Sequence, residues 1–269
     1  MLALSEKARR LPLDREAEVL GVSPDGARVL VREDQVPYLI EVETNRRQPL
    51  RLTPQPTAES RVSWSPDGKK VLYTSGENLV VATLEPLACK THKIKSEDAV
   101  FGATEAELLA VMKGARPTSH DYHIRLLENE RLVTLDAQNG EIRRTVLEYP
   151  LAVLGRPSLH PDGKSLALFA NWATARTKRN GTRICRLGLE GGSPQPLVEG
   201  LFHGSSLSWE PGGRELFAVC KPAQAGEAAW RDANWGDLYA FPASGGPGKN
   251  LTRIGKLNAA WVAPGAGAL

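Results

Sequence analysis

Three stretches of the chain gather side chains that could bind a ligand or take part in catalysis. They are KGARPTSHDYH (113–123), NWATARTKRNG (171–181) and KPAQAGEAAWRDANWG (221–236). Tryptophan and arginine contribute most to binding energy at protein interfaces. The candidate binding residues are Arg116, His120, Tyr122, His123, Trp172, Arg176, Arg179, Trp230, Arg231 and Trp235.

Two other interpretations apply to the same residues. Trp172 and Trp235 adjoin expected strands, so they could instead cap a hydrophobic core while the basic residues are solvated. His120, Asp121 and His123 carry metal-binding groups, but a strand would point the two histidines to opposite faces. We therefore expect a polar loop, with no metal and no cofactor.

Catalytic motifs are missing from the sequence. HGSSLSW (203–209) lacks the second glycine of the G-x-S-x-G nucleophile elbow, and no phosphate-binding glycine motif opens a helix. A polysaccharide lyase or glycosidase would need a base beside cations, and His120, His123, Arg176, Arg179 and Arg231 could supply them. Because nothing in their spacing requires this, we favour a binding module over an enzyme and predict no catalytic residue.

Composition limits the compartment and the partners. The 269 residues carry a net charge of +3 without runs of like charge, which does not support a nucleic-acid partner. No apolar run reaches the roughly 18 residues of a membrane span, so no membrane insertion is expected. The N-terminus MLALSEKARRLPLD lacks the apolar core of a signal peptide. As written, the chain is expected in the cytoplasm, or in the periplasm or outside the cell if its N-terminus is truncated.

A repeated turn organises the strands that must position these stretches. The copies are VSPDGARVLV (22–31), WSPDGKKVLY (64–73), LHPDGKSLAL (159–168) and WEPGGRELFA (209–218), with degenerate copies FGATEAELLAV (101–111) and WVAPGAGAL (261–269). Proline presets one turn residue and glycine supplies the positive φ of another. A short apolar strand follows each turn, and repeats at this spacing are typical of propellers.

Each unit provides four strands, A to D, and the chain resembles the WD-repeat-like β-propeller of the TolB type. The resemblance rests on Ser-Pro-Asp-Gly between two strands, a D-L-Y-like strand, a Gly-Gly turn and a Leu-Thr ending. It implies an all-β propeller that acts as an interaction platform, as the gating propeller of a longer serine peptidase, or as a polysaccharide lyase. The N-terminal α/β domain of full-length TolB has no counterpart here.

We expect one propeller domain of five complete four-stranded blades and a partial sixth. The expected blades are 16–53, 60–95, 98–147, 153–198 and 205–253, with a partial blade at 257–269 and a closing strand at 9–13. Either five blades close with these ends as a patch, or the chain is a piece of a larger ring. The three stretches are the B-to-C loops of blades 3–5 and should share one rim, where a protein or peptide binds, with carbohydrate as an alternative.

Overall fold

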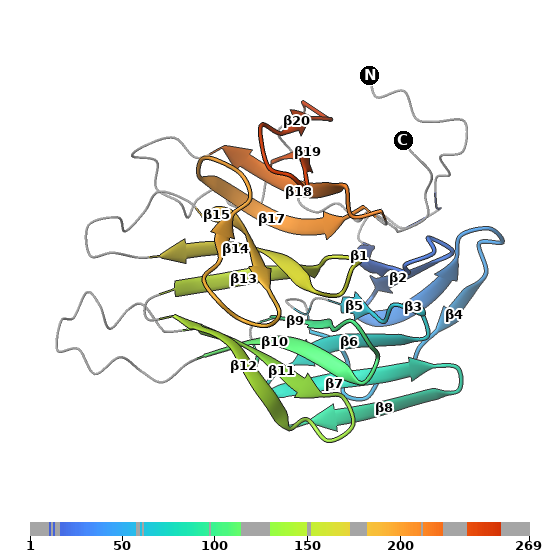
Figure 1. Ribbon diagram of the computed structural model, residues 1–269. Coiled ribbons are helices and arrows are strands. Elements are labelled where there is room, and N and C mark those ends of the chain that lie inside the picture. The colour runs from blue at the N-terminus through green and yellow to red at the C-terminus, as the bar shows by residue number, and fades with distance from the viewer. Residues whose placement is uncertain are drawn as a thin grey trace, which may run out of the picture.

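The protein is an all-β propeller of five four-stranded antiparallel blades (Figure 1). The computed structural model describes residues 11, 13, 17–57, 60, 62–96, 98–113, 130–149, 152–172, 182–210, 212–222 and 236–253. These residues form strands, turns and extended segments, with no helix among them. The expected partial blade at 257–269 lies outside them, as does the closing strand at 9–13 apart from Leu11 and Leu13.

The strands of each blade follow one another in chain order, so every blade is a meander of three hairpins. Blade 1 is β1 (Glu18–Val22), β2 (Arg28–Glu33), β3 (Val36–Glu41) and β4 (Arg47–Pro49), and blade 2 is β5 (Val62–Trp64), β6 (Lys70–Ser75), β7 (Asn78–Leu84) and β8 (Leu87–His92). Blade 3 is β9 (Asp98–Phe101), β10 (Glu107–Lys113), β11 (Glu130–Asp136) and β12 (Ile142–Tyr149). Blade 4 is β13 (Ala152–Leu159), β14 (Ser165–Trp172), β15 (Arg183–Gly188) and β16 (Gln195–Pro196), and blade 5 is β17 (Phe202–Trp209), β18 (Glu215–Pro222), β19 (Asp237–Pro242) and β20 (Lys249–Asn250).

The repeated quartets are the A-to-B turns, as predicted. The glycine that closes each of the four clear copies has a φ between 67° and 70°. In blade 2 the Ser65 hydroxyl donates to Asp67 Oδ1 at 2.6 Å, and the Lys69 N–H donates to the same oxygen at 3.0 Å. The Ser65 Oγ also accepts from the Lys70 N–H at 2.8 Å, so serine and aspartate together bind the backbone of the turn.

These bonds predict an acid-sensitive contribution to stability. Desolvation acts to raise the pKa of Asp67, but the Ser65 hydroxyl and the Lys69 N–H lower it to about 2. The stabilisation by this carboxylate is therefore complete above a pH of about 4 and is lost as the pH falls toward 2. We expect Asp67→Asn to lower the free energy of unfolding by about 1 kcal/mol at pH 7, allowing for solvent screening, and by much less at pH 2.5.

Urea unfolding from pH 7 to pH 2.5 measures this difference. Asp34→Asn, at an exposed hairpin tip, is the matched control and should show a smaller, flatter difference. A difference in unfolding free energy between wild type and Asp67→Asn that stays constant down to pH 2.5 would contradict the stabilising role of the Asp67 carboxylate.

The hydrophobic core lies between successive blades. One cluster joins Leu30 and Leu39 of blade 1 to Val71 and Tyr73 of blade 2. Corresponding clusters join blades 2 and 3, blades 3 and 4, and blades 4 and 5. A four-stranded sheet has two faces to cover, and stacking on its neighbours covers them.

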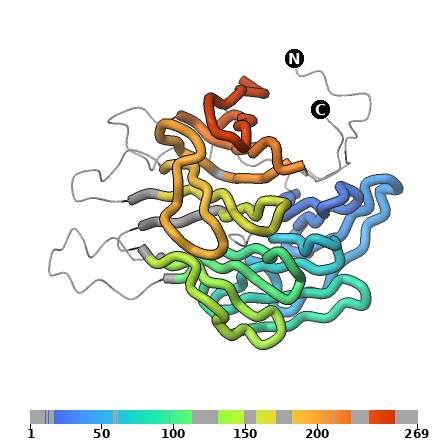
Figure 2. The backbone as a smooth tube through the Cα atoms, in the orientation of Figure 1, coloured from blue at the N-terminus to red at the C-terminus, as the bar shows by residue number. Residues whose placement is uncertain are grey.

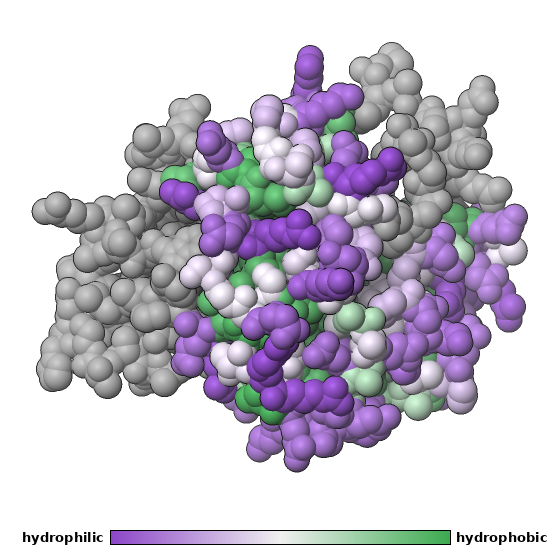
Figure 3. Space-filling view, in the orientation of Figure 1, coloured by the Kyte–Doolittle hydropathy of each residue, from purple (hydrophilic) through white to green (hydrophobic). Residues whose placement is uncertain are grey.

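The outer strands are mostly exposed and charged. Hydrophilic residues predominate over β8 and β12 in the lower part of Figure 3, and Arg143 and Arg144 lie on β12. Charged side chains on an edge strand discourage pairing with another molecule. The outer strand of blade 1, β4, has only three residues. It ends at Pro49 because Leu50 and Leu52 turn into the core between blades 1 and 2.

Candidate functional site

The B-to-C connections divide the blades into two groups. Blades 1 and 2 have two-residue turns, at Asp34 and Gln35 and at Gly76 and Glu77. In blades 3–5 the B and C strands are separated by 16, 10 and 14 residues. The flanking strand ends are those of β10 and β11, β14 and β15, and β18 and β19, which all lie on the left in Figure 1 and Figure 2.

This shared rim follows from the topology. In every blade the A and C strands run opposite to B and D, so all B strands end on the same side of the ring. Loops at consecutive positions on one rim can contact the same ligand. Long loops in compact domains are often functional.

In blade 5, hydrogen bonds between side chains hold the end of the long connection. Asp237 accepts from Thr252 Oγ1 at 3.0 Å and from Asn250 Nδ2 at 2.9 Å. The Leu238 N–H donates to Thr252 Oγ1 at 3.0 Å. The D-L-Y and N-L-T segments are therefore bonded to one another, a pairing of two repeated motifs that sequence reasoning missed. The network fixes where β19 leaves the rim.

Gly236 lets the backbone just before β19 pass close to β18. A Cβ at this position would lie 2.5 Å from the carbonyl oxygen of Cys220 on β18. Any other residue would push the two strands apart. The end of the blade 5 connection is thus held by close backbone packing as well as by the Asp237 network.

In blade 4, the end of the connection is bonded to the next blade. Thr182 pairs with Phe202, the first residue of β17, through backbone bonds of 2.8 and 2.7 Å. The Thr182 hydroxyl also donates to the Phe202 carbonyl at 2.9 Å. The connection of blade 4 therefore ends against the inner strand of blade 5, beside the end of β18, since Phe202 also pairs with Pro222.

In blade 3, Arg131 provides a buried donor at the base of the connection. It is the second residue of β11, on the face that carries Val133 and Leu135 toward blade 2. Its Nε–H is buried and has no hydrogen-bond partner among the described residues. An unsatisfied buried donor is costly and calls for an explanation. Arg131 is a candidate rim residue that sequence reasoning missed, because it looked like an ordinary strand residue.

On blade 1 the same rim is occupied by internal ion pairs. Arg32 is only 6% exposed, and it pairs with Glu18 and donates to the Pro56 carbonyl at 3.2 Å. Glu33, 8% exposed, pairs with Arg47 at 2.8 Å. Each pair joins one buried and one partly exposed side chain, so the charges are compensated within blade 1, although Glu33 Oε1 has no hydrogen-bond partner among the described residues.

Most of the predicted site residues fall in the long connections, outside the described residues. These are Arg116, His120, Tyr122, His123, Arg176, Arg179, Trp230, Arg231 and Trp235. Trp172 is the last residue of β14 and lies opposite Ala152 of β13. The prediction of a binding site made from these residues stays a prediction.

No protein-family model matches the chain, and neither does any curated protein sequence. Solved structures do match. TolB from Acinetobacter baumannii aligns with a TM-score of 0.63 at 17% identity, over 90% of this chain and 55% of that one. An oligogalacturonate lyase in complex with manganese aligns with a TM-score of 0.56 at 17% identity, over 84% of this chain and 62% of that one. A nidogen/laminin complex gives a TM-score of 0.56 at 11% identity, over 84% and 75% of the two chains.

The fold is a TolB-type β-propeller. At these identities the likeness concerns the fold alone. The chain spans little more than half the length of the TolB structure that it matches. The recognition of the fold from the repeated turns is thereby confirmed.

Metal ligands, nucleophilic cysteines and a histidine–aspartate pair are the catalytic groups that can be assessed in the described part of this TolB-type propeller. It holds no group of three or more metal-ligating side chains. Burial raises the pKa of the Cys185 and Cys220 thiols to about 12, so both stay protonated and unreactive at neutral pH. His160 and Asp162 lie 3.0 Å apart, but on the opposite rim, where His160 Nε2 bonds to the Gly213 carbonyl.

Within the described residues of the propeller, no helix is long and apolar enough to cross a membrane.

Proposed function

We propose that this chain is a non-catalytic binding module, and that it takes up a protein or peptide at the rim formed by the B-to-C ends of blades 3–5. One observation carries the proposal. Three consecutive blades have long connections on one rim, whereas blades 1 and 2 have two-residue turns there. The binding surface is therefore confined to one sector of the ring.

The chemistry of the rim favours a peptide-like ligand. The Arg131 Nε–H at the base of the blade 3 connection is a buried donor without a partner in the described part of the chain, and backbone carbonyls of an extended peptide are suitable acceptors. The connections add Trp172, Trp230 and Trp235 as apolar contacts, with Arg176, Arg179 and Arg231 as further donors. Interfaces of this kind combine aromatic anchors with arginine.

Carbohydrate is the second candidate ligand. The likeness to an oligogalacturonate lyase supports it at the level of fold, and stacking on tryptophan suits a sugar ring. A lyase would also need a base beside several cations. His120 and His123 of the connections are candidates, and His203 of β17 lies opposite Lys221 on this rim. We rank the peptide first because a buried donor, the Arg131 Nε–H, lies at the base of these connections and three tryptophans lie on or beside them.

Selection from a displayed peptide library, followed by titration of the selected peptides, tests the proposal. Alanine at Trp172, Arg179, Trp230 and Trp235 together should weaken binding at least about 100-fold, since interface hot spots each cost more than about 1 kcal/mol. The melting temperature should change little. The matched control is Arg214→Ala, an 83% exposed arginine on the opposite rim, which should bind as the wild type does.

Three results would contradict the proposal. Selected peptides that bind the quadruple variant as well as the wild type would exclude this rim. Equal weakening by Arg214→Ala would show non-specific charge attraction. Binding to an oligosaccharide array but to no peptide would favour the carbohydrate alternative.

A further inference from the structure

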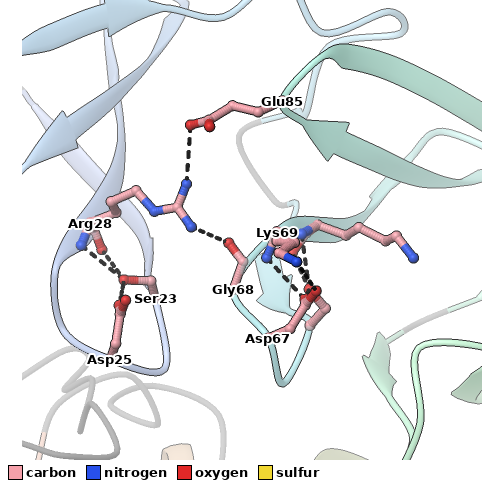
Figure 4. Close-up of polar contacts among 9 residues, drawn as sticks. Ser23, Asp25, Arg28, Asp67, Gly68, Lys69 and Glu85 are labelled. Atoms are coloured by element: carbon pink, nitrogen blue, oxygen red, sulfur yellow. Dashed lines mark hydrogen bonds and ion pairs between the residues drawn. The ribbon is translucent and has the colours of Figure 1, made fainter.

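Two arginines on the rim that carries the A-to-B turns are bound within the fold. Arg28 of blade 1 donates to the Gly68 carbonyl at 2.6 Å and pairs with Glu85 at 3.4 Å, both on blade 2 (Figure 4). Arg214 of blade 5 pairs with Glu210 at 3.0 Å. These guanidinium groups bind carbonyls and carboxylates of the turns, so their charge serves the propeller itself.

On the opposite rim, two arginines occupy the same position in successive blades. In every blade one residue of the C strand pairs with the sixth residue of the B strand. In blades 1 to 5 the residues at this position are Val36, Asn78, Arg131, Arg183 and Asp237. Blades 3 and 4, which carry long connections on this rim, thus place a guanidinium group at equivalent points one blade apart.

Both arginines face the preceding blade. Arg131 lies on the face of β11 that carries Val133 toward blade 2. Arg183 lies on the face of β15 that carries Cys185 toward blade 3. Because stacked sheets pack about 10 Å apart, the Cα atoms of the two arginines lie at roughly this separation. The rim therefore presents two positive charges whose spacing is set by the stacking of the blades.

Neither guanidinium group is bound to another described residue. Arg131 is partly buried, and its Nε–H is one of four buried polar side-chain atoms without a partner in the described part of the chain. Another is Oγ of Ser96, which is 9% exposed and lies in the crossing from blade 2 to blade 3, on the boundary that Arg131 faces. Glu148 lies opposite Arg131 on β12, but it is exposed and makes no ion pair with it. A partly buried cation without a bound counter-charge favours an anionic ligand.

We propose that the ligand taken up at this rim is an acidic extended peptide, and that two of its carboxylate side chains bind Arg131 and Arg183. Each carboxylate accepts charge-assisted hydrogen bonds from the Nη groups of one arginine. The inference rests on the binding function proposed above and names the chemistry of its ligand.

The spacing of the arginines selects the spacing of the acidic residues. In a polyproline II segment, residues three positions apart lie on the same face and are about 9 Å apart along the axis. Two acidic residues three positions apart therefore match two arginines one blade apart. A further carboxylate toward blade 5 would meet Asp237, which is acidic and already bound to Thr252 and Asn250. The preference is thus for one acidic pair and not for a long acidic run.

Selection from a library of random twelve-residue displayed peptides tests this chemistry. The wild-type protein should enrich peptides with two acidic residues three positions apart. The double variant Arg131→Gln/Arg183→Gln should enrich no such peptides. Its melting temperature without peptide should stay within about 2 °C of the wild type, because neither arginine has a bond to a described residue to lose.

Titration of a selected peptide then assigns each carboxylate to its arginine. Each single Arg→Gln variant should weaken binding about 10-fold, the effect of losing a hydrogen bond between charged groups. When the matching Glu of the peptide is replaced by Gln, the same variant should weaken binding less than about 3-fold, because the pair is already broken. The matched control is Arg28→Gln on the opposite rim, which should lower the melting temperature by about 2 to 4 °C and leave the affinity unchanged.

Enriched peptides that lack acidic pairs and bind the double variant as tightly as the wild type would overturn this inference. The binding function proposed above would still stand if the quadruple variant lost those peptides. Strictly additive losses in the titrations would also overturn the inference, since the arginines would then not contact the carboxylates. If no peptide is enriched, both proposals fail, and arginine-dependent binding of an oligosaccharide of uronic acids would then favour carbohydrate.

Discussion

Gly204→Ala should lower the free energy of unfolding by about 3 kcal/mol, at the upper end of what overpacking a core costs. Gly204 lies on β17, where an added Cβ would be 1.9 Å from Cζ of Phe169 on blade 4. Phe169 is 4% exposed and belongs to the cluster between blades 4 and 5, so its ring has no free space to move into. The clash must therefore displace the inner strand or the ring.

Urea unfolding of three further variants separates this clash from other effects of the glycine. Gly204→Ala combined with Phe169→Leu should be more stable than the sum of the two single variants predicts, because the smaller side chain makes room. Gly188→Ala is the matched control, since the nearest atom to its Cβ is 3.7 Å away, and it should change stability by less than about 0.5 kcal/mol. A Gly204→Ala protein as stable as the wild type would show that β14 of blade 4 and β17 of blade 5 do not approach this closely.

Trp209→Ala should lower the free energy of unfolding by about 4 kcal/mol. The indole fills the space between blades 4 and 5, packs on His160 at 4.7 Å and donates to the Ser158 carbonyl at 3.1 Å. Trp209→Phe keeps part of the apolar contact and loses the hydrogen bond. It should cost less than the alanine variant, though the Ser158 carbonyl then lacks this donor.

The two variants, compared by denaturant unfolding, divide the effect into packing and hydrogen bonding. The expected order of stability is wild type, then phenylalanine, then alanine. Tyr239→Phe is a suitable control, since Tyr239 is only partly buried beside the same cluster and its hydroxyl contacts Asn250 at 3.2 Å. A loss below about 1 kcal/mol for Trp209→Ala would contradict its role as the link between the blades.

The repeated turns explain why so much of the fold was predictable. The hydrogen bonds of each Ser-Pro-Asp-Gly turn join residues within about six positions of one another, as Ser65, Asp67 and Gly68 show. A short stretch of sequence therefore determines the structure of the turn. The strands that follow alternate or run apolar over a few residues. Local signals of this kind predicted the hairpins, the four-stranded blades and the rim on which the B-to-C ends lie.

The candidate site was predictable only in part. The position of the long connections followed from the blade pattern, and the strand ends confirm that they begin and end on one rim. The roles of Arg131 and of the Asp237 network were not visible, because they depend on a neighbouring blade or on a strand more than ten residues away. The binding roles of the residues within the connections stay predictions.

By itself, the sequence determined the turns, the four-stranded units and their order along the chain, because each depends on conformational preferences within a few residues. Only the tertiary structure decided how one blade meets the next: Arg28 on Gly68, His160 on Gly213, Trp209 on Ser158 and Gly204 against Phe169. Such contacts join residues about 35 to 55 positions apart. They depend on how two complete sheets pack against each other, and no short stretch of sequence specifies that packing.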